Sequence, residues 1–258
     1  MQSISNCENV CNQNLVKHND YILNLILEKT GFKKGIGYCD IHKKNYECLV
    51  DKQTNKPTGC PFCEEETERK IQQQALMYSR IDGLPKRYRH ASFKNYVVKT
   101  ETQKHVFNTV LAYAKNPSYR WLVMLGNNGT GKTHLSHAIL KCTGGIYREF
   151  DEIASELLDA QAKGQGKISE IIHNYSTAKM LVIDEIDKVK ATEGRIRWLN
   201  IILRRRYNNL LPLVILGNTD VNTICNSVDL LGNQAIRDRI REVGTVLQFP
   251  WTSYRENQ

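Results

Sequence analysis

The sequence is informative first through what it lacks. No apolar run approaches the roughly 20 residues that a helix needs to cross a bilayer, so no membrane span is predicted. The opening residues, MQSISNCENV, lack the basic and then apolar pattern of a secretory signal. The chain also has no internal repeat and no low-complexity tract. We therefore expect a cytoplasmic protein with no membrane partner, made of one large globular domain or two unequal ones.

Acidic residues are too few to balance the basic ones, and the formal net charge of the 258-residue chain is +9. Such an excess of base favours contacts with polyanions, although it says nothing about the fold. Nucleic acid is the leading candidate partner. The hydrophobic share of 41% is ordinary for a globular domain, so a packed core is expected.

The pattern of apolar residues predicts helices that alternate with buried strands. Helical periodicity covers residues 15–29 and 101–116. Residues 64–80 are rich in good helix formers and begin with acids, which indicates a mostly solvated helix or linker. Apolar runs typical of buried strands lie at residues 121–125, 180–184 and 211–218. The alternation predicts an α/β fold with a parallel sheet.

The stretch GNNGTGKT, residues 126–133, has the spacing of a phosphate-binding loop. It follows a predicted strand and precedes a predicted helix, which is the context that the motif requires. Backbone N–H groups of such a loop bind phosphates, Lys132 reaches the β- and γ-phosphates, and the Thr133 hydroxyl binds magnesium. The nucleotide-binding residues predicted here are Gly126, Asn128, Gly129, Thr130, Gly131, Lys132, Thr133 and His134.

Polar residues follow two further predicted strands. Asp184 and Glu185 end the run LVIDE, where ligands gather in open α/β sheets. One carboxylate, assigned to Asp184, can hold Mg²⁺, and the other, Glu185, can polarise a water for attack on the γ-phosphate. Asn218 ends the third strand, and its amide is predicted to orient the same water.

Two short pairs of metal ligands, Cys39-x-x-His42 and Cys60-x-x-Cys63, predict a Zn²⁺ site. Each pair brings two ligands onto one turn, and two such turns close a tetrahedral site. The surrounding residues hold too few aliphatic side chains for an independent core, so metal binding would supply the missing folding free energy. Cys48 is a rival to His42, because both fit the loop. The matching two-residue spacing favours His42.

The other cysteines receive no ligand role. In an intracellular chain, cysteines bind metal, react or fill core space more often than they form disulfides. Cys7 and Cys11 have helical spacing but no partner nearby, and Cys142 and Cys225 are expected in the core.

Three arginines fall within five residues of the stretch LLGNQAIRDRIREVG, residues 230–244. On a helix that turns by about 100° per residue, Arg237 and Arg241 share a face, whereas Arg239 points about 200° away from Arg237. A solvated basic helix paired through Asp238 and Glu242 is one interpretation. A separate anion for Arg239 is the other.

The motifs GNNGTGKT, LVIDEID, LGN, LLGNQAIRDRIR and FPWTSYREN together resemble the AAA+ ATPase domain of DnaC-type replicative helicase loaders, across residues 92–257. The resemblance implies that Arg239 is the arginine finger that enters a neighbouring subunit's ATP site. It also implies that Asn218 is sensor 1 and that Arg255 is a second sensor. In ASFKNY, residues 91–96, the backbone and apolar groups either meet adenine or belong to the core.

The resemblance implies an ATPase that delivers a hexameric, DnaB-type replicative helicase to single-stranded DNA and self-associates through its ATP sites, in a bacterial cell or encoded by a phage. Its expected cofactors are ATP, Mg²⁺ and Zn²⁺. Residues 1–82 would form a helicase-binding domain with a zinc module at about 36–66, as in many loaders, and residues 83–258 the ATPase domain. Basic residues expected near DNA are Lys188, Lys190, Arg195 and Arg197. The alternatives are an IstB-type transposition helper ATPase and a zinc-bearing nucleic-acid adaptor with a weak nucleotide site.

Overall fold

The structure is a computed structural model that describes residues 27, 29–118, 120–187, 193–228 and 235–255. The chain divides into two compact units between Gln74 and Ala75. Apart from residues 27 and 29, the helix expected over 15–29 lies outside the described part, as do Cys7 and Cys11. None of the helices within the described part is both long and apolar enough to span a bilayer.

The first unit contains a two-stranded antiparallel hairpin, β1 (Phe32–Cys39) and β2 (Lys44–Asp51). The buried hydrophobic side chains of its described part are Leu27, Cys39, Tyr46, Val50 and Cys60, and three of them, Cys39, Tyr46 and Cys60, form one cluster. The hydroxyl of Tyr46 donates to Thr58 O at 3.0 Å, and a Cβ at Gly37 would lie 2.6 Å from the Tyr46 ring. The hairpin thus closes over one aromatic ring and several thiols, with no aliphatic side chain in the cluster.

Helix α2 (Pro61–Ser79) contains the division between the units and has no buried residue. Proline at the first helical position and Glu64 in the first turn suit a helix N-terminus. The prediction of a solvated helix here is confirmed.

The second unit is built on a six-stranded sheet whose neighbouring strands all run parallel. Its spatial order is β3-β5-β6-β7-β4-β8. The strands are β3 (Ile81–Asp82), β4 (Trp121–Gly126), β5 (Gly145–Glu149), β6 (Leu181–Asp184), β7 (Leu213–Gly217) and β8 (Gly244–Phe249). The three buried strands predicted from sequence are confirmed as β4, β6 and β7, which lie together in the middle of the sheet.

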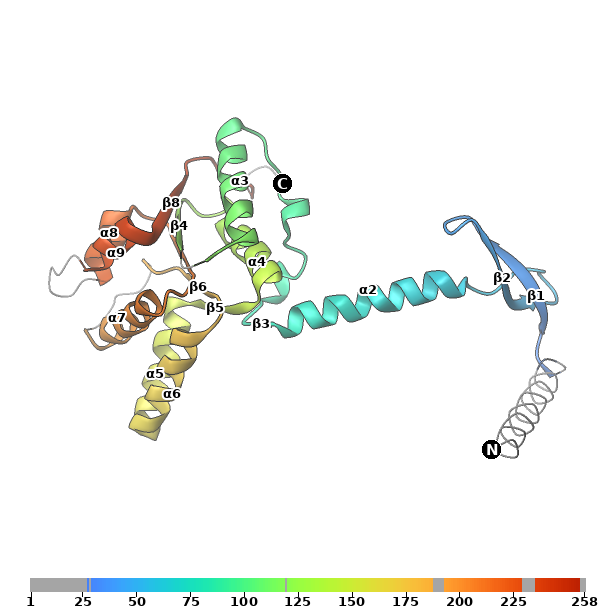
Figure 1. The fold of residues 1–258 in the computed structure, drawn as a ribbon, viewed down its shortest axis with the longest axis horizontal. Coiled ribbons are helices and arrows are strands. Elements are labelled where there is room, and N and C mark those ends of the chain that lie inside the picture. Colours follow the sequence, from blue (N-terminus) through green and yellow to red (C-terminus); the bar gives the residue numbers. More distant parts are fainter. Residues whose placement is uncertain (1–26, 28, 119, 188–192, 229–234, 256–258) are drawn as a thin grey trace, which may run out of the picture. The chain divides into compact units, whose positions relative to one another are not determined.

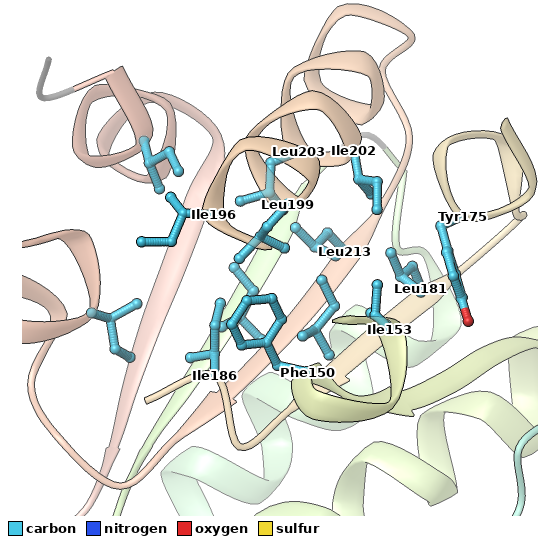
Figure 2. Close-up of a cluster of buried hydrophobic side chains, with 14 of the residues drawn as sticks. Phe150, Ile153, Tyr175, Leu181, Ile186, Ile196, Leu199, Ile202, Leu203 and Leu213 are labelled. Atoms are coloured by element: carbon cyan, nitrogen blue, oxygen red, sulfur yellow. The ribbon is translucent and has the colours of Figure 1, made fainter. Parts of the chain in front are cut away.

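Helices cover both faces of this sheet (Figure 1). They are α3 (Glu101–Lys115), α4 (Lys132–Thr143), α5 (Phe150–Lys163), α6 (Gln165–Thr177), α7 (Glu193–Asn208), α8 (Val221–Val228) and α9 (Ala235–Val243), with 3₁₀ turns at Lys86–Tyr88 and Phe93–Asn95. Alternate strand residues enter two separate cores. Leu122 and Met124 pack with α3 and α4, whereas Trp121, Val123 and Leu125 pack with α5, α6 and α7. Figure 2 shows the second core, with Phe150 of α5 and Leu199 of α7 among its labelled side chains.

Arg206, on α7, is fully buried and binds three backbone carbonyls, two at the end of α6 and one just before β7. Its guanidinium donates to Tyr175 O at 2.8 Å, to Ala178 O at 2.9 Å and to Pro212 O. Burial lowers the pKa of Arg206 to about 10. The group therefore stays charged at neutral pH and supplies donors that these buried carbonyls would otherwise lack.

Strand β3 joins the sheet through its pairing with β5, so the sheet begins before the boundary expected between residues 82 and 83. Ile81 and Asp82 belong to the sheet because of their hydrogen bonds to the neighbouring strand, and the periodicity of apolar residues does not reveal such bonds.

Cys225 is buried as expected, but the expectation for Cys142 is wrong, because it is exposed. The last turn of α4 buries Leu140 and Thr143 instead.

Candidate functional site

A cavity of about 830 Å³ lies at the carboxyl ends of β4, β6 and β7. Most of the residues predicted for nucleotide binding and hydrolysis line it: Asn128, Gly129, Thr130, Gly131, Lys132, Thr133, His134, Asp184, Glu185, Asn218 and Arg255. Gly126 lies just behind this wall, where its carbonyl accepts from Lys132. The fold therefore brings the ends of three separate strands together at one site.

The loop between β4 and α4 has a backbone that requires glycine. Gly131 precedes α4 with φ 95°, and a Cβ there would lie 2.6 Å from the Tyr96 ring. Gly126 has φ 143°, and its Cβ would lie 2.5 Å from the backbone oxygen of Phe249. These glycines let the loop approach its neighbours closely, and the N-terminus of α4 lines the cavity, which is the arrangement that binds phosphate.

Lys132 is 6% exposed and its ammonium group lies within the loop. Its Nζ donates to Gly126 O at 2.5 Å, to Asn127 O at 2.8 Å and to Asn218 Oδ1 at 3.2 Å. A phosphate oxygen is a stronger acceptor than these neutral groups. An incoming nucleotide would therefore draw the ammonium group towards its phosphates.

Asp184 and Thr133 form a cluster of oxygen ligands at the end of β6. The Thr133 hydroxyl donates to Asp184 Oδ2 at 2.9 Å, and the backbone N–H of Glu185 donates to Asp184 Oδ1 at 2.7 Å. Carboxylate and hydroxyl oxygens beside a phosphate-binding loop are the ligands that Mg²⁺ takes with a nucleotide. The residues present fit Mg²⁺.

Glu185 adopts φ 54°, a left-handed conformation that costs a residue other than glycine about 1–2 kcal/mol. Such strain persists where the surrounding structure fixes it, and it clusters at functional sites. Because the backbone turns at Glu185, this residue lines the cavity and does not continue the strand. Sequence alone could not reveal this backbone conformation.

Asn218 reaches the site because of the strand order. β7 lies between β4, which leads into the phosphate loop, and β6, which ends in Asp184. The side chain of Asn218 accepts from Lys132, and its backbone N–H donates to Asp187 Oδ2 at 2.6 Å. Asp187 therefore fixes the end of β7. Sequence reasoning missed this role, because the two residues meet only through the sheet.

The segment after β8 closes over the phosphate loop. Trp251 Nε1 donates to Thr130 O at 2.9 Å, and the backbone N–H of Tyr254 donates to Gly129 O at 2.9 Å. Arg255, the predicted second sensor, is exposed and lines the cavity. In the segment before α3, the core alternative is confirmed for both aromatic residues, and a contact with adenine stays a prediction. Phe93 packs against the core, whereas Tyr96 both packs there and lines the cavity.

Comparison with known proteins assigns the chain to a family. The family model for "IstB-like ATP binding protein" matches residues 61–258. The chain belongs to this family of IstB-like ATP binding proteins. Among its relatives is the "Replicative helicase loader DnaC" of Buchnera aphidicola subsp. Schizaphis graminum (strain Sg), which is 29% identical over 196 residues and matches 71% of this chain and 78% of that protein.

Solved structures show the same AAA+ fold. The crystal structure of the DnaC helicase loader aligns with a TM-score of 0.56 at 22% identity, over 64% of this chain and 99% of that one. The replication initiator DnaA bound to AMPPCP and single-stranded DNA aligns with a TM-score of 0.53 at 21% identity, over 65% of this chain and 51% of that one. The prediction of an AAA+ P-loop fold with a parallel sheet is confirmed.

Arg239 is placed differently from the other predicted residues of this IstB-like domain. It lies on α9 and is not among the described residues that line the cavity. Its guanidinium carbon is 5.4 Å from the centre of the Tyr207 ring, and the Tyr207 hydroxyl donates to Glu242 Oε2 at 2.5 Å. Arg241, on the same helix, is exposed and lies 3.8 Å from Asp238. Within the described part of the chain, Arg239 therefore lies apart from the cavity that holds the predicted nucleotide-binding residues.

The basic residues expected near DNA are only partly described. Lys188 and Lys190 lie outside the described residues. Arg195 and Arg197 lie on α7, where Arg195 pairs with Asp151 at 3.2 Å and Arg197 is exposed. The ion pair leaves Arg197 as the more accessible of the two for a phosphate backbone.

The four predicted zinc ligands lie together in the first unit. The candidate ligand atoms of Cys39, His42, Cys60 and Cys63 all lie within 4.8 Å of one another. Cys39 Sγ is 3.3 Å from His42 Nδ1 and 3.6 Å from Cys63 Sγ, and Cys63 Sγ is 3.5 Å from His42 Nδ1. Tetrahedral zinc with bonds of about 2.0–2.3 Å sets its ligands about 3.4–3.8 Å apart. The residues fit Zn²⁺.

Neighbouring groups tune these ligands. Hydrogen bonds from the backbone and ring of His42 lower the pKa of Cys39 to about 6, while the bond to Cys39, together with burial, raises the pKa of Cys63 to about 12. Two thiolates this close repel each other, and a divalent cation relieves the repulsion. His42 Nε2 lies 3.5 Å from Glu66 Oε2, which orients the ring as carboxylates do for zinc-bound histidines. Cys48 packs against the cluster but is not one of the four.

Proposed function

We propose that the chain is an ATP-hydrolysing loader that delivers a hexameric replicative helicase, of the DnaB type, to single-stranded DNA, and that it works in the cytoplasm. The observation that carries the proposal is the cavity that gathers Lys132, Asp184, Glu185 and Asn218, while Arg239 lies apart from it. The relative named as a helicase loader supports the choice of this function within the IstB-like family.

The residues of the cavity divide the hydrolysis of ATP among them. Lys132 and the N-terminus of α4 bind the phosphates, and Thr133 with Asp184 would hold Mg²⁺, which neutralises charge on the phosphates when bound. Glu185 accepts a proton from the water that attacks the γ-phosphorus, and the Asn218 amide orients that water. The bond to the β-phosphate oxygen breaks as the new bond forms, and ADP leaves.

Arg239 completes the site of an adjacent copy. An arginine suits this task because its planar, permanently charged fork can bind two phosphate oxygens. ATP would therefore join neighbouring ATPase domains, and loss of the γ-phosphate would loosen the joint. In the single chain, the Arg239 guanidinium lies over the Tyr207 ring, a cation–π contact that a neighbouring phosphate would replace.

Mixing experiments test the shared site. Arg239→Ala is expected to lower ATP hydrolysis by about 10³-fold, as loss of an arginine finger does. Arg241→Ala, on the exposed face of the same helix, is the matched control and should change hydrolysis by less than about twofold. Mixing the Arg239→Ala chain with Lys132→Ala chains should restore part of the activity, because each copy supplies what the other lacks. Absence of recovery in the mixture would show that Arg239 acts within its own chain.

The first unit is proposed to bind the helicase, and the second to bind ATP and DNA. The small zinc module of the first unit and the solvated helix α2 suit an adaptor better than a catalytic domain. Co-purification of the full chain with candidate hexameric helicases, with and without ATP, tests this role. Lys132→Ala should lose the effect of ATP on capture, whereas Lys163→Ala, an exposed lysine on α5, should behave as the parent chain does. If no hexameric helicase is captured in any nucleotide state, the chain is not a loader.

A transposition helper ATPase is the second candidate, because the family model that matches carries the IstB name. Such a protein would bind long duplex DNA and a transposase, and it would ignore the helicase. The same co-purification with a transposase in place of the helicase separates the two functions. A nucleic-acid adaptor without hydrolysis would instead retain every binding activity in the Lys132→Ala chain.

A further inference from the structure

Tyr147 lies beside the proposed magnesium site, and no motif of the sequence points to it. It belongs to β5, which pairs with β6, and its side chain is 4% exposed. Its hydroxyl donates to Asp184 Oδ2 at 2.9 Å. The Thr133 hydroxyl donates to the same oxygen at 2.9 Å. The two hydroxyls thus come from different elements and meet at one carboxylate oxygen.

The Asp184 carboxylate depends on its donors because it is 6% exposed. A buried carboxylate is costly unless hydrogen bonds satisfy its oxygens. Glu185 N–H fixes Oδ1, and the two hydroxyls fix Oδ2. If a metal ion takes Thr133 as a ligand, the Tyr147 hydroxyl remains as the side-chain donor to Oδ2 and sets the rotation of the carboxylate together with the Glu185 N–H on Oδ1.

An aromatic stack holds Tyr147 in place from the other side. The ring of His137, on α4, lies 4.4 Å from the Tyr147 ring and 4.8 Å from the Tyr88 ring, measured between ring centres. His137 is fully buried, and burial lowers its pKa to about 3. The histidine ring is therefore neutral and adds no cation next to Asp184. Burial also raises the pKa of Tyr147, and the charge of Asp184 does so further, which keeps the phenol protonated and able to donate.

Tyr113 shows what a purely structural buried tyrosine looks like in the same domain. It is 8% exposed, and its hydroxyl lies 3.0 Å from Arg120 O and 3.2 Å from Leu213 O, which share its single donated hydrogen. Both acceptors are backbone carbonyls. Tyr147, by contrast, donates to the carboxyl side chain of a residue that lines the cavity, and it lines the cavity itself.

We propose that Tyr147 is a positioning residue of the metal–nucleotide site: its hydroxyl holds the Asp184 carboxylate in the orientation that binds Mg²⁺ together with Thr133. The proposal rests on the proposed function, since it assumes that the cavity binds ATP with Mg²⁺. It assigns Tyr147 no contact with the reacting atoms. The consequence is that removing one hydroxyl weakens the dependence of nucleotide binding on the metal and leaves metal-free binding intact.

The test measures binding of a fluorescent ATP analogue to the full chain as Mg²⁺ is titrated from zero. Tyr147→Phe should raise the Mg²⁺ concentration at half-maximal enhancement by about tenfold, as expected for loss of a hydrogen bond to a charged group. Affinity in the presence of a chelator should stay within about twofold of the parent chain. Tyr113→Phe is the matched control, and it should leave both quantities unchanged.

Melting temperatures are a second measurement, and they remain informative even if a variant is less stable than the parent chain. Each chain is measured alone, with ATP, and with ATP plus Mg²⁺, so each variant is compared with its own nucleotide-free state. Only the additional stabilisation by Mg²⁺ should shrink in Tyr147→Phe. An unchanged response to Mg²⁺ would overturn the proposal, and so would an equal loss of affinity with and without the metal. If the parent chain shows no nucleotide binding, the proposed function itself fails.

Discussion

The two units of the chain reach stability in different ways. The described part of the first unit has a single cluster in which Cys39, Tyr46 and Cys60 are buried, and its two cysteines are among the four candidate metal ligands. The second unit has two cores, one on each face of the sheet, rich in leucine, isoleucine and valine. A small domain without an aliphatic core needs another source of free energy. We therefore expect that a metal ion supports the first unit, whereas hydrophobic burial supports the second.

Removal of the metal is expected to have the largest effect on stability. This effect should be confined to the first unit. Structural zinc contributes about 10–16 kcal/mol to the folding of small domains. Chelation, or the substitution Cys60→Ser, should therefore abolish the protection of β1 and β2 amides in hydrogen exchange, while the amides of β4 and β7 stay protected. Elemental analysis should find one zinc per chain beforehand. A hairpin that remains protected without metal would contradict the comparison.

Loss of the Arg206 guanidinium should have an intermediate effect, in the second unit alone. Arg206→Met keeps much of the volume but leaves the carbonyls of Tyr175, Ala178 and Pro212 without this donor. Unsatisfied buried carbonyls cost about 1–3 kcal/mol each, so a loss of about 3 kcal/mol is expected after partial relaxation. Urea unfolding measures it. Arg205→Met, its exposed neighbour on α7, is the control and should change stability by less than about 0.5 kcal/mol.

Cys48→Ser should have the smallest effect on stability. It also tests whether Cys48 is a ligand of the metal. Cys48 packs beside the four ligands but is not one of them, so the variant should retain its zinc and lose less than about 1 kcal/mol. His42→Ala should lose affinity for zinc. Elemental analysis of both variants after dialysis decides the matter, and zinc missing from Cys48→Ser alone would make Cys48 the ligand.

Much of the second unit could be predicted from its sequence because its signals are local. The buried runs at β4, β6 and β7 are continuous stretches of apolar residues, and the phosphate loop is a set of glycines at fixed spacing. β5 was not predicted, because GIYRE mixes polar and apolar residues on a partly covered strand. β8 was not predicted for a similar reason, because only two of its residues, Leu247 and Phe249, are buried.

The side chains around the site show where local signals end. Tyr147, Asp187 and Trp251 contact the predicted residues, yet none of them belongs to a motif with fixed spacing. Their contacts depend on which strands are neighbours and on where the last segment returns. The cysteine pairs are the opposite case, because two-residue spacing already forces each pair onto one turn.

The sequence by itself determined the chemistry of this protein: the phosphate loop, the acidic strand end and the four metal-ligand residues are all encoded by spacing along the chain. Only the tertiary structure decided how these parts act together. It placed β7 between β4 and β6, so that Asn218 reaches Lys132, and it brought Tyr147 to Asp184. The reason is physical: spacing fixes contacts within a turn or a strand, whereas contacts between strands follow from the order in which the sheet buries its apolar faces.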